Sequence, residues 1–320
     1  MWPRVQRSSL IFPVNVPRFV ERAWTRNADY LTLDLEDAVP PAQKAAARPL
    51  VKEAIAVAAR GGSDVSVRIN HETPLEDCEA SVWPGLRAIH YPKTESREEI
   101  VELDRIITRL EQERGIPEGT VEIVAMMETV HGVWNAAEIA GASPRIKHFG
   151  GFAAGDGSTS LGVTIEDQRF VNVLGWGEGE TDLAGRSQGK TVTGAPRWEP
   201  GAPVFSVSEG VDQQLRETDR MAWRRGGRSA GGIHPSVVEP ANQSFTPSAE
   251  DVLGAEEIAA AYRQAYETGQ GFGVYRGRVI DAAVAGRAQE LIEYARACAE
   301  RDREKAEAQE RMRKEQGDAR

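Results

Sequence analysis

Short apolar runs alternate with longer amphipathic stretches through the first half of the chain. The runs are rich in β-branched and aromatic residues, which favour strands. The stretches between them carry apolar residues at helical spacing. This order predicts strand–helix units around a parallel sheet. The predicted strands cover residues 8–13, 30–35, 65–69, 86–91, 121–127 and 146–152.

Helix signals separate these strands. Thr73-Pro74-Leu75-Glu76 and Ser96-Arg97-Glu98-Glu99 have the spacing of a capping box, and residues 42–60 form an alanine-rich helical pattern. A glycine-rich dinucleotide turn does not follow the first strand. The six units therefore favour a closed α/β barrel of the TIM type, (β/α)8, over an open doubly wound sheet.

The regular alternation stops between residues 163 and 203. The glycine-rich segment 175–180 and Gly194-Ala195-Pro196 predict loops where a sixth helix is expected. Residues 190–193 and 204–207 both qualify as the seventh strand. A helix over 211–225 follows, and an eighth strand over 229–233 ends at His234-Pro235.

The remaining segment predicts a C-terminal addition to the barrel. Thr246-Pro247-Ser248 precedes a long helix that runs to Thr268, a short hairpin covers 272–280, and a last helix begins near Asp281. We divide the chain into a barrel domain (1–240), a helical lid with its hairpin (241–300) and a charged tail (301–320). The tail alternates charges without apolar content, which predicts a solvated helix extension or a frayed end.

Composition narrows the class of protein. The chain has 320 residues, a size that one α/β barrel often occupies, with 40% apolar and 28% charged residues. Its net charge of −10 argues against nucleic acid as a partner. Cys78 and Cys298 are isolated and predict free thiols in a reducing compartment. Because we find neither a signal peptide nor an apolar run of membrane length, we expect a cytoplasmic protein.

Polar residues at the predicted carboxyl ends of the strands are the first candidates for a site, since barrel active sites lie there. Carboxylates dominate this set, and Mg²⁺ prefers oxygen ligands while keeping several waters. The five histidines show no zinc spacing. The candidates are Asp34, Glu36, Asp37, Arg68, Asn70, Lys93, Glu128, Asp156 and His234.

An ordered set of motifs resembles the citrate lyase β-subunit and malyl-CoA lyase family, the HpcH/HpaI aldolase-like CoA-ester lyases. The resemblance runs from near the N-terminus to the last helix, and its strength lies in the order of the motifs. They are Arg7-Ser8-Ser9-Leu10, Leu33-Asp34-Leu35-Glu36-Asp37-Ala38-Val39, Arg68-Ile69-Asn70, Pro92-Lys93-Thr94-Glu95, Glu128-Thr129-Val130-His131-Gly132-Val133, Gly155-Asp156 followed by Leu161-Gly162, Gly232-Ile233-His234-Pro235, Phe245-Thr246-Pro247-Ser248 and Val279-Ile280-Asp281.

The resemblance implies a magnesium-dependent lyase, with Mn²⁺ as a possible substitute, that acts on CoA esters such as malyl-, citramalyl- or citryl-CoA. It implies metal ligation by Glu128 and Asp156 and an electrophilic role for Arg68. Asp281 matches a catalytic base that serves a neighbouring subunit, which implies a homotrimer or hexamer. Further implied roles are substrate contacts for Arg7, Gly155 and Asp156, and support of the site by Glu36, Asp37 and Lys93.

Each assignment has a simpler structural alternative. Glu128 can be a buried ion-pair partner, and Asp156 a turn residue. Arg68 can pair with the acids that follow the second strand. Asp281 suits a helix N-cap. A stripe of arginines at 18, 22 and 26 suits either CoA phosphates or, preferably, a solvated helix face.

The sequence also contains features that are compatible with other functions. Segments 185–189 and 227–231 match the serine-hydrolase elbow, Gly-x-Ser-x-Gly, but Ser187 and Ser229 lack the strand-before, helix-after context. A malyl-CoA type thioesterase and a non-catalytic subunit of a lyase complex remain alternatives. The chain departs from the family pattern over 163–209, so the acyl group and the acceptor stay open.

Overall fold

The computed structural model describes residues 5–150, 159–162, 172–193, 211–224 and 226–318. Gly155 and Asp156 lie outside these residues, as does the alternative seventh strand at 204–207. Eight parallel strands form one sheet in the order β7-β6-β5-β4-β3-β2-β1-β8. The strands are β1 (Ser8–Pro13), β2 (Tyr30–Asp34), β3 (Asp64–Arg68), β4 (Leu86–Tyr91), β5 (Glu122–Met126), β6 (Ile146–Gly150), β7 (Thr191–Thr193) and β8 (Ala230–Gly232).

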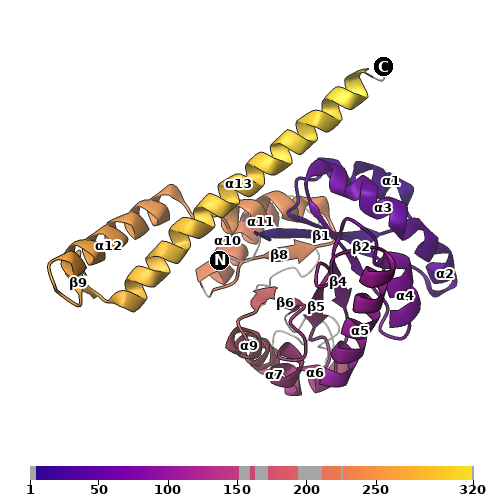
Figure 1. Cartoon of the computed structure of the whole chain (residues 1–320), viewed down its shortest axis with the longest axis horizontal. Helices are drawn as coiled ribbons and strands as arrows, with labels where there is room; N and C mark the ends of the chain where they lie inside the picture. The colour runs from indigo at the N-terminus through magenta and orange to yellow at the C-terminus, as the bar shows by residue number, and fades with distance from the viewer. Residues whose placement is uncertain (1–4, 151–158, 163–171, 194–210, 225, 319–320) are drawn as a thin grey trace.

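This sheet curls into the barrel of a TIM-type α/β fold, as predicted (Figure 1). Pairing between β7 and β8 is not seen in the described part of the chain. Helices cover the outside of the sheet. They are α1 (Pro17–Arg22), α2 (Lys44–Ala47), α3 (Val51–Ala58), α4 (Pro74–Ser81), α5 (Arg97–Glu113), α6 (Val130–Trp134), α7 (Ala136–Ala140), α9 (Asn172–Ser187), α10 (Val211–Arg224) and α11 (Val238–Ser244).

Side chains along each strand point alternately toward the surrounding helices and toward the barrel interior. The outward face of β2 buries Leu31 and Leu33 against the helices. The inward face carries Tyr30, Thr32 and Asp34. Thr32 hydrogen-bonds Ser66 of β3 at 3.0 Å inside the barrel. The barrel is therefore apolar outside its sheet and partly polar within.

Local signals explain most helix starts and one interruption. Ser96 begins α5 with a complete capping box, as predicted. Thr73 precedes α4 but its side chain makes no cap; its Oγ1 accepts instead from Arg48 at 2.9 Å. The helix predicted over 42–60 is divided, because Pro49 lies between α2 and α3 and cannot donate a helical hydrogen bond.

The loop predicted over 175–180 is wrong. These residues lie within helix α9. Glycine weakens a helix by about 1 kcal/mol per residue relative to alanine, and tertiary packing outweighs that preference here. Ala184 enters the hydrophobic core, and Thr181 Oγ1 donates to Gly177 O at 2.8 Å.

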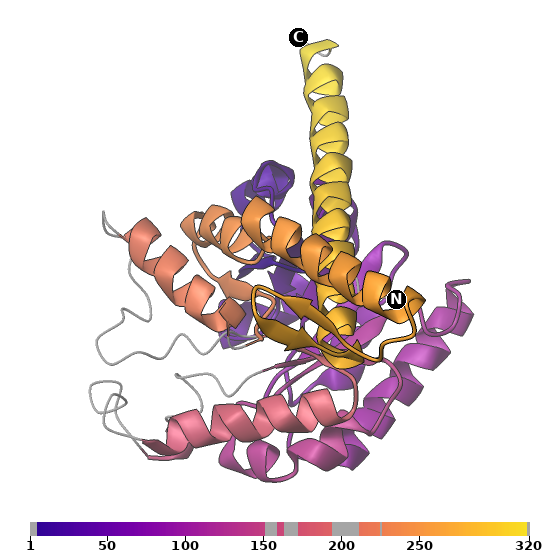
Figure 2. The same cartoon turned by 90° about the vertical axis from the view of Figure 1, so that its left-hand side faces the viewer.

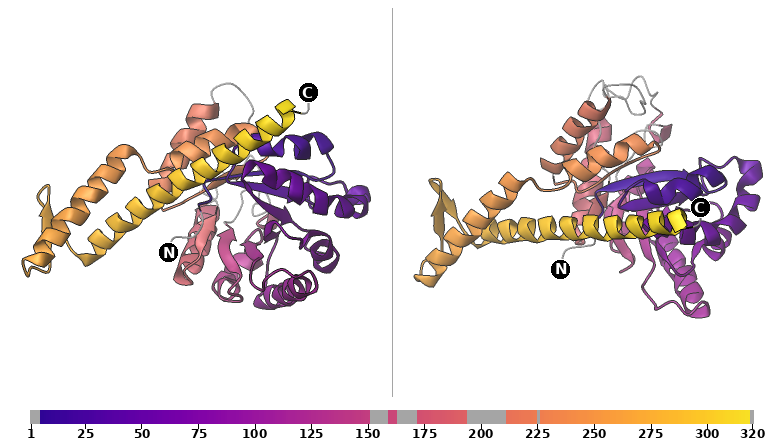
Figure 3. Two further views of the ribbon diagram at one scale, coloured as in Figure 1. Left: turned by 45° about the horizontal axis from the view of Figure 1, so that its top comes forward. Right: turned by 90° about the horizontal axis from the view of Figure 1, so that it is seen from above.

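The C-terminal segment forms an arm, defined here as α12 (Ala249–Glu267), β9 (Gly273–Tyr275), β10 (Arg278–Ile280) and residues 282–300 of α13 (Ala282–Asp318). Figures 1 and 3 show that the arm extends away from the barrel. In Figure 2 the β9–β10 hairpin closes its outer end and joins α12 to α13. Helix, hairpin and final helix follow the predicted order.

The charged tail is a helical extension whose first half has one exposed face and one buried face. Helix α13 continues unbroken from the arm and crosses the amino ends of the strands. Lys305 Nζ donates to Asp29 Oδ1 at 2.6 Å, and Arg301 lies 3.3 Å from Asp64. The side chains of Arg301 and Lys305 are only 3% and 0% exposed, so these two charges belong to the buried face of the tail.

Candidate active site

Arg68 and Asp34 form the centre of the site at the carboxyl ends of β3 and β2. The two residues are paired in the sheet register and both face the barrel interior. Arg68 Nε and Nη2 donate to the two Asp34 oxygens at 2.8 and 2.7 Å. Such a two-point contact fixes the plane of the guanidinium. Arg68 is thereby held at the mouth with 12% of its side chain exposed.

Acids that follow β2 complete the surroundings of Arg68. Its Nη1 lies 2.9 Å from Glu36 Oε2 and 3.5 Å from Asp37 Oδ2. Burial raises the pKa of Glu36, while the charges of Arg68 and Lys93 oppose that rise. Burial by itself lowers the pKa of Arg68, but its contacts with Asp34 raise it above the ordinary value. Arg68 therefore remains a fixed cation.

Lys93 and Glu128 join the same cluster from the ends of β4 and β5. Lys93 Nζ donates to Glu36 Oε1 at 2.5 Å, and its backbone N–H donates to Glu128 Oε2 at 3.1 Å. Lys93 has a φ of 51°, a left-handed conformation that is rare for a side chain of this size. That backbone conformation lets one residue contact both carboxylates. Glu128 is 3% exposed.

The ion cluster at the mouth consists of Arg68, Lys93, Asp34, Glu36, Asp37 and Glu128, and it has an excess of negative charge. Arg68 and Lys93 contribute +2, while Asp34, Glu36, Asp37 and Glu128 contribute −4, so the formal sum is −2. Carboxylate oxygens are the ligands that Mg²⁺ prefers. The described residues by themselves do not bring three His, Cys, Asp or Glu side chains close enough to hold a metal ion. The carboxylate donors of this cluster fit the oxygen ligands that magnesium prefers.

Several predicted residues lie elsewhere. Arg7 is at the amino end of β1, opposite the mouth, and is buried against Asp29 with Nε to Oδ2 at 2.9 Å. The structure therefore places Arg7 at the other end of the barrel from Arg68 and Glu128. Asp281 is exposed on the arm and caps α13 through Val284 N at 2.9 Å. His234 is exposed and contacts Ser236.

His90 also belongs to the surroundings of the site, although its position within β4 rather than at the strand end did not predict this. It lies on β4 two residues after Ala88, which belongs to the barrel interior, and therefore faces the same way. Burial, His148 and Arg68 lower the pKa of His90 to about 3. The alternation within residues 86–91 is the signal that identifies it. A neutral imidazole lies beneath the ion cluster.

Hydrolase geometry does not occur at either elbow-like segment. Ser187 ends helix α9 and precedes strand β7, and Ser229 precedes strand β8. Both orders reverse the strand–turn–helix context of a nucleophile elbow. Ser187 Oγ also donates to Ala184 O at 2.8 Å.

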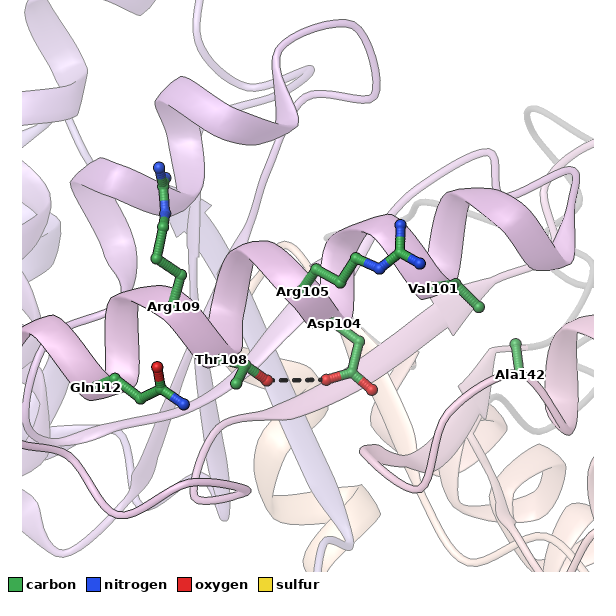
Figure 4. Close-up of a pocket in the computed structure, with 7 residues that line it drawn as sticks. All are labelled: Val101, Asp104, Arg105, Thr108, Arg109, Gln112 and Ala142. Atoms are coloured by element: carbon green, nitrogen blue, oxygen red, sulfur yellow. Dashed lines mark hydrogen bonds between the residues drawn. The ribbon is translucent and has the colours of Figure 1, made fainter.

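A depression of about 370 Å³ lies on the outside of the barrel over α5, with Ala142 opposite (Figure 4). Asp104 in its lining accepts from Thr108 at 3.3 Å and from Arg145 at 2.5 Å. None of the strand-end residues lines it. The depression is therefore separate from the candidate active site.

Among the described residues, every helix is too short or too polar to cross a membrane.

Comparison with known proteins gives the same class as the fold. Citrate lyase subunit beta of Leuconostoc mesenteroides subsp. cremoris is 30% identical over 300 residues, which cover 92% of this chain and 94% of that protein. L-malyl-CoA/beta-methylmalyl-CoA lyase of Cereibacter sphaeroides is 31% identical over 312 residues, 91% of this chain and 95% of that protein. A solved citrate lyase beta subunit from M. tuberculosis, complexed with oxaloacetate and magnesium, aligns with a TM-score of 0.57 and 25% identity over 76% of this chain and 98% of that chain.

Fold, site and relatives together define a TIM-type barrel lyase with carboxylates gathered at its mouth. Residues 7–184 match HpcH/HpaI aldolase/citrate lyase, and this chain belongs to that family. The matched segment contains every described residue of the ion cluster.

Proposed function

We propose that this protein is a magnesium-dependent CoA-ester lyase that cleaves or forms the carbon–carbon bond of a 3-hydroxyacyl-CoA, giving an acyl-CoA and a 2-oxo acid. The supporting observation is the ion cluster at the mouth, where four carboxylates surround two cations. A site with this excess of acid attracts a divalent cation. The names of the relatives supply the substrate class.

Glu128 and Asp156 would hold the magnesium ion, and Asp156 lies outside the described residues. When bound, the ion polarises the oxygens of the keto acid and holds its carboxylate. Glu128 suits this role because it is buried at a strand end with one backbone donor, Lys93 N, already fixing its direction. Gly155, also outside the described residues, would add a backbone contact to the substrate carboxylate.

Arg68 would stabilise the negative charge that develops on oxygen during bond formation. Its guanidinium is clamped by Asp34, so no rearrangement is needed when charge appears. Glu36, Asp37 and Lys93 would keep this clamp in place. These residues support the reacting groups without contacting the substrate.

Asp281 would act as the base on the site of a second copy. In the condensing direction its carboxylate takes the α-proton of the acyl-CoA, and the resulting carbon attacks the keto carbonyl. Cleavage uses the same groups in reverse. Asp281 is exposed on an arm that extends away from its own barrel. The hairpin beside it exposes Phe272, Val274 and Val279, apolar residues that suit burial against another copy.

The test is product identity. Purified protein with Mg²⁺ is incubated with malyl-CoA, citramalyl-CoA and citryl-CoA, and products are separated by liquid chromatography. The proposal expects acetyl-CoA with glyoxylate, pyruvate or oxaloacetate, respectively, and loss of turnover with a chelator. Free CoA with the intact hydroxy acid would identify a thioesterase instead. No turnover of any thioester, with no effect of Mg²⁺ on keto-acid binding, would favour a non-catalytic subunit.

A further inference from the structure

A cavity of about 470 Å³ lies between the barrel and the arm, remote from the ion cluster at the mouth. Its walls come from the end of α10, the segment before β8, the first half of α12 and the first half of α13. A volume of this size is typical of sites for small molecules. The strand-end residues of the candidate active site do not line it.

Arg228 is the central charged group of this cavity. Its guanidinium carbon lies 4.2 Å from the centre of the Trp223 ring and 6.0 Å from that of Tyr294. The two rings are themselves stacked, with centres 5.7 Å apart. Stacking on an aromatic face fixes a guanidinium and leaves its edge available for hydrogen bonds. Arg228 is therefore presented as a rigid, oriented cation.

The charge of Arg228 is not neutralised by an ion pair among the described residues. Nη1 donates to Gly227 O at 2.8 Å, and the structure gives Nε and Nη2 no further partner within the described chain. Burial lowers the pKa of Arg228, although Tyr294 acts in the opposite direction. The charge of Arg287, which also lines the cavity, adds to the lowering.

The charges around Arg228 include both signs. Arg276 lines the cavity but lies 3.3 Å from Glu257, which neutralises it. Asp251 is engaged in the cap of α12, where Oδ2 accepts from Ser248. Glu290 faces Arg228 at longer range, and Arg186 adds positive charge from outside the cavity. Glu250 is exposed at the rim. Arg228 and Arg287 are thus the lining cations that form no ion pair among the described residues.

The rest of the wall is aliphatic. Leu253 and Ile258 on α12 and Leu291 on α13 line the same cavity, and Ile258 and Leu291 also pack against the buried contact between these two helices. Apolar contact with such a wall stabilises a bound hydrocarbon chain in proportion to the apolar surface that it buries. A cation with a free hydrogen-bonding edge at one end and an aliphatic wall beside it define the ligand chemistry.

We propose that this cavity binds an organic carboxylate with a short aliphatic body. Arg228 holds the carboxylate through Nε and Nη2, and the aliphatic part lies against the lining residues Leu253, Ile258 and Leu291. Because the ligand contacts both the barrel segment and the arm, binding stabilises their relative position. The proposal does not depend on the reaction at the mouth.

Isothermal titration of the full-length protein with sodium hexanoate, acetate and inorganic phosphate tests this site. Hexanoate is expected to bind at least tenfold tighter than acetate or phosphate, because only hexanoate uses the aliphatic wall. Arg228→Gln should weaken hexanoate binding at least tenfold. Arg311→Gln removes an exposed arginine from the distal part of α13 and should leave binding unchanged.

A second variant guards against misfolding. Leu253 is 56% exposed, so Leu253→Asp is compatible with the fold while placing a carboxylate in the cavity. This variant should keep its thermal unfolding temperature and lose hexanoate binding. Hexanoate binding that survives both Arg228→Gln and Leu253→Asp, or equal affinity for all three anions, would overturn the proposal.

Discussion

The backbone N–H of Lys93 donates to Glu128 Oε2 at 3.1 Å while the ammonium group of the same residue reaches Glu36 at 2.5 Å. Lys93 achieves both contacts through a left-handed backbone with φ of 51°. One residue thus links the end of β4 to the acid that we propose as a metal ligand. The backbone and the side chain of Lys93 make separable contributions.

Replacing Lys93 with glycine or alanine separates the two contributions. Both variants lose the ammonium group, but only glycine adopts a positive φ without steric cost. Lys93→Gly should therefore be more stable than Lys93→Ala by about 1 kcal/mol in urea unfolding. Equal stability of the two would show that the left-handed conformation of this residue carries no strain.

Glu128→Gln removes one negative charge while keeping a side-chain oxygen that can accept from Lys93 N. We expect Mg²⁺ to bind at least tenfold more weakly by calorimetric titration, because a neutral amide is a poorer ligand for a hard cation. Glu138→Gln, an exposed change on α7, is the matched control and should bind like the original protein. An unchanged Kd for Glu128→Gln would remove this residue from the proposed metal site.

Sharing of the site between copies is tested by complementation. Asp281→Asn keeps a helix cap but lacks the proposed base, and Arg68→Ala lacks the electrophilic group. Each variant alone should be inactive. Co-expressed, they should regain turnover, because some sites then combine an intact Arg68 with an intact Asp281 from another copy. Inactive mixed preparations that are shown to contain both chains would contradict a shared site.

Replacing Lys305, which lies far from the mouth of the barrel, should strongly lower the free energy of unfolding. Burial by itself raises the pKa of Asp29, but the hydrogen bonds and charges of Arg7 and Lys305 outweigh this effect and lower the pKa to about 2. Lys305→Met leaves Asp29 buried with fewer partners and should cost about 3 kcal/mol in the free energy of unfolding. Lys314→Met, at a lysine that is 71% exposed, should change it by less than about 0.5 kcal/mol. Similar losses of unfolding free energy in both variants would mean that the buried contact of Lys305 with Asp29 does not stabilise the fold.

His148 makes the stability depend on pH. Burial, with the charge of Arg87, lowers the pKa of His148 from 6.5 to about 4. Glu122 Oε2 is 3.9 Å away, but Glu122 pairs with Arg87 at 2.5 Å and does not hold a proton on the imidazole. The folded state thus favours neutral His148. Its contribution is complete above pH 6.5 and is lost as the pH falls toward 4, because the unfolded chain binds the proton first.

The matching experiment follows the free energy of unfolding between pH 7.5 and pH 5. His148 should account for a loss of about 2 kcal/mol over this interval. His148→Gln should lack that component, whereas His131→Gln, at an exposed histidine, should retain it. Parallel pH curves for all three proteins would exclude His148 as the source.

Local signals in the sequence identified much of the fold and of the ion cluster. The pattern over 8–13 and 86–91 gave both strands with their full bounds, and Ser96 marked the start of α5. The predicted carboxyl ends of the strands also placed Arg68 and Glu128 at the same end of the barrel. These features depend on near neighbours in the chain, so the sequence carries them directly.

Other features were decided by contacts between distant segments. Glycines at 175–179 predicted a loop, but packing of α9 on the barrel made them helical. Arg301 and Lys305 look like surface charge until α13 brings them to Asp29 and Asp64. Arg7 is likewise buried against Asp29, which lies more than 20 residues away in the sequence. Burying a charge is costly unless an opposite charge is buried beside it. Which distant residue supplies that opposite charge depends on the tertiary structure and cannot be read from the sequence.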